Sequence, residues 1–167
     1  CVSEIFHSRH VICALNAQTG QELDTIVSPA PQTRDVLVVG GGPAGMEAAR
    51  VAALRGHRVT LCEAGSKLGG TVFFSSIAYK PNGQLIGYLS KQIRDLPIEL
   101  RLNTCVDESL VEPLNPDVVV VATGALRDAA AIQGTEQSNV FSGDELRALM
   151  TGDSSSPAVA KLSRFQR

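Results

Sequence analysis

The sequence predicts an α/β fold of the Rossmann type, in which helices cover a doubly wound parallel sheet. Three observations predict it: apolar runs at 36–39 and 118–121, and a glycine-rich turn directly after the first run. Short apolar runs without polar alternation are typical of strands buried on both faces of a parallel sheet. The glycines occur as Gly40-x-Gly42-x-x-Gly45, and an alanine-rich helical pattern begins at once.

The three glycines have separate tasks in a turn that holds a pyrophosphate. Gly40 permits the tight turn, Gly42 lets the backbone approach the phosphate, and Gly45 lets the helix pack against the strand. The start of the helix then offers free N–H groups and the positive end of its dipole. We expect this helix over 46–55 and a left-handed Gly56 at its end. Together these features predict a dinucleotide as the ligand.

A second strand is expected over 58–61, and Glu63 follows it. Glu63 lies 23 residues after Gly40, where a dinucleotide-binding unit carries the acid that binds the ribose. The alternative is that the glycines serve packing alone. Because the strand, the helix, the capping glycine and the acid all agree, the dinucleotide is favoured.

The next segment, 64–83, is predicted to be a long connection with paired glycines. Gly69, Gly70 and Thr71 would bring backbone N–H groups and a hydroxyl against the cofactor, and the alternative is an ordinary turn. Apolar residues at helical spacing then predict a surface helix over 84–96. Alternation predicts a strand over 98–102 with one solvent face, and a short strand is expected around 105–106.

Small residues follow the second valine run, as Ala122-Thr123-Gly124. At the carboxyl end of a central parallel strand they suit the crevice where α/β folds bind ligands. Residues 139–150 predict a short strand and then a helix, with Ser142 as N-cap and Glu145 at the third helical position. Residues 151–167 are predicted to be a flexible tail.

The first 31 residues have no strong period and are predicted to form an irregular arm that ends in a linker. Cys1 and Cys13 are either two unrelated thiols or part of a cysteine cluster site. Two cysteines cannot complete a zinc or iron–sulfur site, which typically takes four ligands. Cys62 and Cys105 are expected to be small buried hydrophobes. Because the chain begins with Cys and not Met, we expect a domain of something longer.

The composition fits a soluble globular protein of 167 residues, with 44% hydrophobic and 19% charged residues. A net charge of −2 gives no electrostatic reason to expect nucleic acid or an anionic membrane as partner. No apolar run is long enough to span a bilayer and no signal peptide is evident, so the expected compartment is the cytoplasm. No catalytic triad or metal-hydrolase motif occurs, so no catalytic residue is expected.

Four segments together resemble one family. They are the Cys1-x11-Cys13 pair with CALNAQTGQE, the unit DVLVVGGGPAGMEAA with its later Glu63, the KLGG element, and PDVVVVATGA. Over residues 1–150 the chain resembles the NADH:flavin oxidoreductases related to 2,4-dienoyl-CoA reductase and trimethylamine dehydrogenase. Many flavoproteins with two dinucleotide-binding domains share the last three segments, and the cysteine arm indicates this group.

The resemblance implies that residues 1–31 hold part of an iron–sulfur ligand segment, with Cys1 and Cys13 as the last two ligands of a [4Fe–4S] cluster. Residues 32–150 would then be an FAD-binding domain, incomplete in this chain. The barrel that carries FMN and the nicotinamide domain would be absent, and so would the substrate site. In the parent, electrons would pass from NAD(P)H to FAD and through the cluster to FMN.

The resemblance also bears on which nucleotide is bound and on the residues that would contact it. The negative charge of Glu63 would repel a 2′-phosphate, so NADP is the least expected occupant. Two alternatives stay open: a non-catalytic ADP- or nucleotide-binding module like that of the trimethylamine dehydrogenase branch, and the NAD-binding domain of a simple dehydrogenase. The implied FAD contacts are Gly40, Gly42, Pro43, Ala44 and Gly45 at the pyrophosphate, Glu63 at the ribose, Gly70 and Thr71 near the cofactor, the Val106 backbone at the adenine, and Ala122, Thr123 and Gly124 at the far wall.

Overall fold

The computed structural model describes residues 3–125, 132–137, 139–152 and 157–165. The chain divides into two compact units, residues 1–124 and 125–167. None of the helices in these ranges combines the length and the apolarity needed to cross a lipid bilayer.

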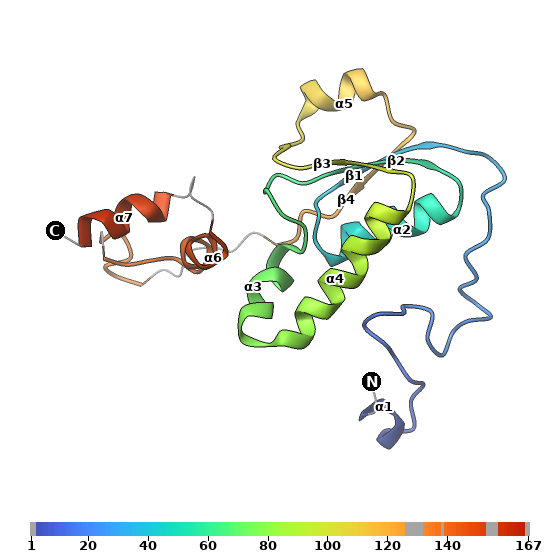
Figure 1. Ribbon diagram of the computed structural model, residues 1–167, viewed down its shortest axis with the longest axis horizontal. Helices are drawn as coiled ribbons and strands as arrows, with labels where there is room; N and C mark the ends of the chain where they lie inside the picture. The colour runs from blue at the N-terminus through green and yellow to red at the C-terminus, as the bar shows by residue number, and fades with distance from the viewer. Residues whose placement is uncertain (1–2, 126–131, 138, 153–156, 166–167) are drawn as a thin grey trace. The chain divides into compact units, whose positions relative to one another are not determined.

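The first unit is built on a four-stranded parallel sheet with the strand order β3-β2-β1-β4 (Figure 1). Helices α2 and α4 lie on one face of this sheet, and α5 lies on the other. The predicted Rossmann-type α/β fold is therefore confirmed. The strands are β1 (Asp35–Val39), β2 (Arg58–Cys62), β3 (Ile98–Arg101) and β4 (Val118–Val121), and the helices of this unit are α1 (Ser3–Phe6), α2 (Pro43–Leu54), α3 (Gly70–Ala78), α4 (Lys80–Asp95) and α5 (Glu108–Leu114).

The core lies between the sheet and helices α2 and α4. Val38 and Leu61 project from the two central strands and are fully buried, as are Met46 and Ala49 of α2. Ile93 of α4 closes the same cluster. Alanine on the inner side of α2 allows the helix backbone to approach the sheet closely, which positions the start of α2 at the carboxyl end of β1.

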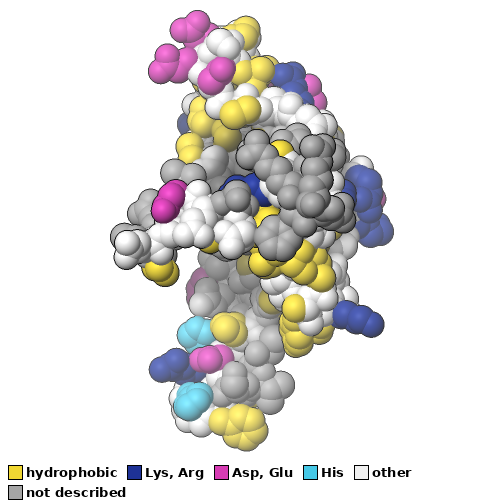
Figure 2. Space-filling model, turned by 90° about the vertical axis from the view of Figure 1, so that its left-hand side faces the viewer, with side chains coloured by type: hydrophobic (Ala, Val, Ile, Leu, Met, Phe, Trp, Pro, Cys, Tyr) yellow, Lys and Arg dark blue, Asp and Glu magenta, His cyan; other side chains and the backbone are white. Residues whose placement is uncertain are grey.

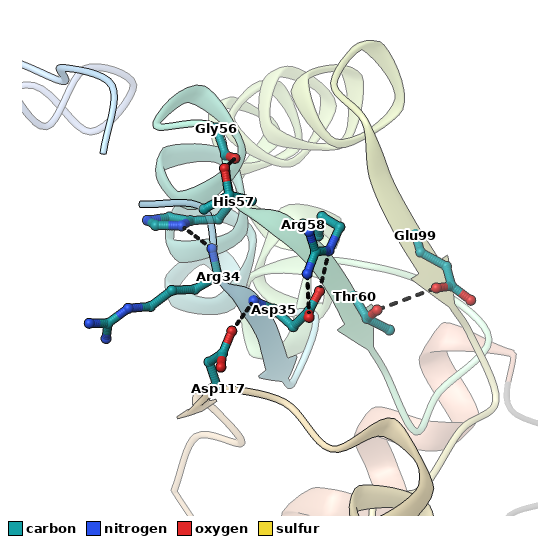
Figure 3. Close-up of polar contacts among 9 residues, drawn as sticks. Arg34, Asp35, Gly56, His57, Arg58, Thr60, Glu99 and Asp117 are labelled. Carbon is teal, nitrogen blue, oxygen red and sulfur yellow. Dashed lines mark hydrogen bonds and ion pairs between the residues drawn. The ribbon is translucent and has the colours of Figure 1, made fainter. Parts of the chain in front are cut away.

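Charged side chains join the amino ends of the strands (Figure 3). The Arg58 guanidinium donates to both carboxylate oxygens of Asp35, at 2.5 and 2.6 Å, and these bonds hold the pKa of Asp35 below its usual value. The Asp35 amide donates to Asp117 at 2.7 Å, and the Arg34 amide donates to the His57 ring at 3.1 Å. The Asp35–Arg58 pair and the bond to Asp117 thus connect β1 to its two neighbouring strands at the end of the sheet opposite the glycine turn.

The connection predicted over 64–83 was wrong, because most of it is helical. Helix α3 occupies its middle, and α4 begins at Lys80, four residues before the predicted start. The KPNG sequence resembles a turn, but Pro81 lies in the first turn of α4, where its missing N–H is not needed. Helix α5 was not predicted; Asp107 caps it by accepting from the Leu110 amide.

Four smaller predictions were also wrong. No strand forms at 105–106 or at 139–141, and Cys105 is exposed because no ladder carries it into the sheet. The valine run forms β4 as predicted, but it is not buried on both faces. Val119 and Val121 are 42% and 74% exposed, because β4 is an edge strand and an open cavity lies between its outer face and α5.

Helix α5 gives its side of the first unit an acidic character. Figure 2 shows acidic side chains gathered beside hydrophobic ones at the top of the view, where Figure 1 places α5. Asp107, Glu108 and Glu112 belong to this segment. An anionic ligand therefore gains no attraction from α5, and any phosphate bound to this unit depends on other groups.

The second unit contains α6 (Gly143–Thr151) and α7 (Pro157–Phe165). The predicted capping box is confirmed: the Glu145 amide donates to Ser142 Oγ at 3.1 Å, and the Ser142 amide donates to the Glu145 carboxylate at 2.8 Å. Helix α7 lies within the segment predicted to be a flexible tail. Lys161 of α7 pairs with Glu145 at 2.5 Å, which gives this helix a partner that the local sequence does not reveal.

The substitution Leu61→Ala tests the position of the core. Leu61 is fully buried, so its removal leaves a cavity and should lower the free energy of unfolding by about 2–5 kcal/mol. Val121→Ala is the control, because Val121 is largely exposed; its effect should stay below about 1 kcal/mol. Denaturant unfolding of both variants measures the difference. Equal losses would contradict the assigned core.

Candidate functional site

The glycine turn after β1 is held in place by two close backbone contacts. Gly40 has a φ of +111°, and a Cβ atom there would lie 2.4 Å from the carbonyl oxygen of Ala122. A Cβ atom on Gly45 would lie only 1.8 Å from the carbonyl oxygen of Gly40. The fold itself therefore requires both glycines, since α2 packs directly on the turn and β4 ends against it.

Gly42 has a different reason to be glycine. Its φ and ψ are −73° and 176°, which any residue adopts, and a Cβ atom there would meet nothing within 4 Å. The protein fold thus leaves free space over Gly42, directly before Pro43 and Ala44 in the first turn of α2. No side chain caps this end of α2. Its first N–H groups are available to a ligand that approaches over Gly42.

The carboxylate of Glu63 lies against the same turn. One oxygen accepts from the Gly41 amide at 2.6 Å, and the other accepts from the Gly65 amide at 2.7 Å. Glu63 is half-buried at the carboxyl end of β2. The acid that the sequence predicts for a ribose therefore points toward the glycine turn and not away from it.

A second glycine turn packs on the first. The Gly69 amide donates to the Gly41 carbonyl oxygen at 2.8 Å, and a Cβ atom on Gly70 would lie 3.2 Å from Gly42 Cα. Gly69 and Gly70 have φ values of +117° and +51°, so both use backbone conformations that favour glycine. Because α3 begins at Gly70 without a side-chain cap, the starts of α2 and α3 meet at Gly42. Thr71 is exposed in the first turn of α3.

The remaining predicted residues lie along the neighbouring strand ends. The Ala122 amide donates to the Val39 carbonyl oxygen at 2.8 Å, which carries 122–124 past the glycine turn. The Thr104 amide donates to the Glu63 carbonyl oxygen at 2.9 Å, so the loop leading to Val106 runs beside Glu63. Val106 and Thr123 line a common cavity on the α5 face.

The sequence did not identify Gly41 and Gly65 as members of this site. Gly41 occupies a variable position of the glycine pattern, and its role depends on Glu63, which is distant in the chain. The run of three consecutive glycines at 40–42 was the signal that could have identified Gly41.

The cysteine arm is described from Ser3 onward, so Cys1 lies outside the described residues. Cys13 is half-buried, and the amides of Leu15 and Asn16 donate to its sulfur. These bonds lower the pKa of the thiol, which favours the thiolate that binds metals. Within the described part of the chain, no three His, Cys, Asp or Glu residues gather as a metal site. Burial instead raises the pKa of Cys62, as expected of a structural thiol.

Comparison with known proteins places this site in context. Residues 35–92 match the family model described as FAD dependent oxidoreductase. A bilirubin reductase of Mediterraneibacter gnavus is 36% identical over 143 residues, which cover 84% of this chain and 22% of that protein. An N,N-dimethylglycine/sarcosine dehydrogenase of Chromohalobacter salexigens is 41% identical over 131 residues, covering 74% of this chain and 19% of that protein.

A solved structure is similar over nearly the whole chain. The complex of 2-naphthoyl-CoA reductase with 2-naphthoyl-CoA superposes with a TM-score of 0.82 at 34% identity, covering 92% of this chain and 23% of the other. This chain spans about a fifth of the length of the curated relatives that it matches.

Alanine substitutions at two glycines should separate the needs of the fold from those of a ligand. Gly45→Ala should destabilise the unit by about 3 kcal/mol or more, because the new Cβ overlaps the Gly40 carbonyl. Gly42→Ala should leave the nucleotide-free protein as stable as the wild type, since space and backbone conformation both allow it. Soluble yield and melting temperature report both results. A similar loss in both variants would show that Gly42 is also required for folding.

Proposed function

We propose that this chain forms the FAD-binding part of an NAD(P)H-dependent flavin oxidoreductase. It carries an FAD-dependent oxidoreductase domain, which is homologous to reductases of the 2,4-dienoyl-CoA reductase type and to amine dehydrogenases. The observation that best supports this proposal is the free space over Gly42. It lies between the starts of α2 and α3, which have no side-chain cap, and beside the acid Glu63. The proposed domain spans 32–150.

The residues present fit the adenosine diphosphate half of FAD. The N–H groups at the start of α2 would bind the pyrophosphate, and Gly42, Pro43 and Ala44 would let it approach. Glu63 would accept hydrogen bonds from the ribose hydroxyls. Bound FAD would supply the redox chemistry, while the chain binds and orients it. The other proposed contacts are Gly40, Gly45, Gly70, Thr71, Val106, Ala122, Thr123 and Gly124.

We extend the proposal to the electron path of the full-length protein, in which nicotinamide, FAD, a [4Fe–4S] cluster and FMN exchange electrons. Cys1 and Cys13 would be two of the four cluster ligands. The lowered pKa of Cys13 supports its part, because cluster irons bind thiolates. The residues that act on substrate would belong to other parts of that protein.

A second candidate is a nucleotide-binding module that holds ADP without flavin. Similarity to a dimethylglycine/sarcosine dehydrogenase favours keeping it, since amine dehydrogenases are among the relatives. Gly42 and Glu63 would serve both candidates alike, because FAD and ADP share the groups that these residues would contact. Flavin absorbance of the purified full-length protein, with analysis of the released nucleotide, distinguishes them. FAD in the extract supports the first candidate, and ADP alone supports the second. If neither nucleotide is released, both candidates are rejected.

Gly42→Val should weaken FAD binding at least about tenfold, because its side chain would project into the space that the pyrophosphate needs. The matched control is Gly87→Val, at an exposed glycine of α4 with equally open surroundings. Titration of the apoprotein with FAD, followed by flavin fluorescence, measures both affinities. Undiminished affinity in a folded Gly42→Val protein would reject the site.

Cys13→Ala should lower the iron and sulfide content of the full-length protein. Cys105→Ala is the control, since this exposed cysteine lies outside the arm and its loss should leave both contents unchanged. Metal analysis and the visible absorbance of the cluster provide the measurement. Normal cluster content in Cys13→Ala would remove Cys13 from the ligand set.

A further inference from the structure

Both oxygens of the Glu63 carboxylate are already bound within the protein. Gly41 and Gly65 donate to them from two different loops, at 2.6 and 2.7 Å. Hydrogen bonds from an amide to a carboxylate are stronger than those between neutral groups. The side chain is therefore a bridge between the glycine turn after β1 and the loop after β2.

The backbone of Glu63 extends this bridge to a third loop. The Glu63 amide donates to the Arg101 carbonyl oxygen at 2.9 Å, and the Glu63 carbonyl oxygen accepts from the Thr104 amide at the same distance. The Asn103 amide donates to the Gly65 carbonyl oxygen at 3.0 Å. The loops that follow β1, β2 and β3 are thus connected through Glu63 and Gly65.

The identity of Gly41 agrees with this arrangement. A Cβ atom on Gly41 would lie 2.9 Å from a carboxylate oxygen of Glu63, 3.0 Å from Glu63 Cβ and 2.6 Å from a methyl carbon of Leu68. Gly41 does not need glycine for a left-handed conformation, because its φ is outside that range. Close approach to Glu63 and Leu68 is the reason that remains.

A carboxylate has about four acceptor positions on its two oxygens. Two of them serve the amides of Gly41 and Gly65, which leaves two for the hydroxyls of a ribose. The same side chain can therefore bind the sugar without releasing the glycine turn. Glutamine cannot replace it, because its single oxygen satisfies one amide and its NH2 group faces the other.

We propose that Glu63 is a positioning residue that holds the glycine turn in its binding conformation before any nucleotide arrives, and that Gly41 is glycine to admit it. The proposal rests on the proposed function for its ligand, but the bridge itself is a property of the nucleotide-free protein. A preformed turn lowers the ordering cost that binding would otherwise carry.

Amide hydrogen exchange of the nucleotide-free full-length protein tests the bridge. Glu63→Gln should accelerate exchange of the Gly41 or Gly65 amide about tenfold or more, as expected from loss of one charge-assisted hydrogen bond. Glu112→Gln removes the same charge from an exposed position of α5 and should change neither amide. The melting temperature of each variant separates local release from global unfolding. Unchanged exchange at both glycines in Glu63→Gln would overturn the proposal.

Binding of two probes separates positioning from sugar contact. If Glu63 only held the ribose, Glu63→Gln would weaken ADP but not 2′,3′-dideoxy-ADP, which lacks the hydroxyls. As a positioning residue, it should weaken both by about tenfold or more. A penalty confined to ADP overturns the proposal. If the wild type binds neither probe, the proposed function fails, and the exchange measurement alone still decides whether Glu63 holds the turn.

Discussion

The close packing of α2 on the ends of β1 and β4 is the constraint on which the site depends. Gly45 and Gly40 touch through backbone atoms, and the Ala122 carbonyl fills the space behind Gly40. Because no side chain separates these segments, the start of the helix, the turn and the neighbouring strand end pack directly on one another. Gly42 then faces open space, and this space, which packing leaves unused, is the position that we propose for a ligand.

The two ends of the sheet differ in how their charged and polar groups are arranged. At the amino end, Asp35 and Arg58 neutralise each other, and Asp117 accepts from a strand amide. At the carboxyl end, the donors are backbone amides at two helix starts, and Glu63 is the acid beside them. Binding of a phosphate there would use oriented peptide dipoles, in a protein whose formal net charge is −2.

The features that were predictable from sequence depend on local patterns. Apolar runs identified β1 and β4, spacing identified Glu63, and the capping box was recognised because Ser142 and Glu145 lie within one turn. Features that tertiary contacts decide were missed. The KPNG sequence around Pro81 was predicted to be part of a connection, but Pro81 lies in the first turn of α4. Cys105 was expected to be buried, but it is exposed because it does not belong to a strand. The role of Gly41 needed a partner from another strand, which no local pattern shows.

Strand β4 has a consequence beyond the nucleotide site. In the described part of the chain, no strand pairs with its outer edge, and Val119 and Val121 are exposed on one face. Four consecutive valines with unpaired peptide groups form a template onto which a strand from another molecule can add. Pro116 and Asp117 disfavour strand addition at one end of this edge. Solubility of this unit therefore depends on whether another segment or chain covers the edge. Folding intermediates that expose it would be prone to self-association at high concentration.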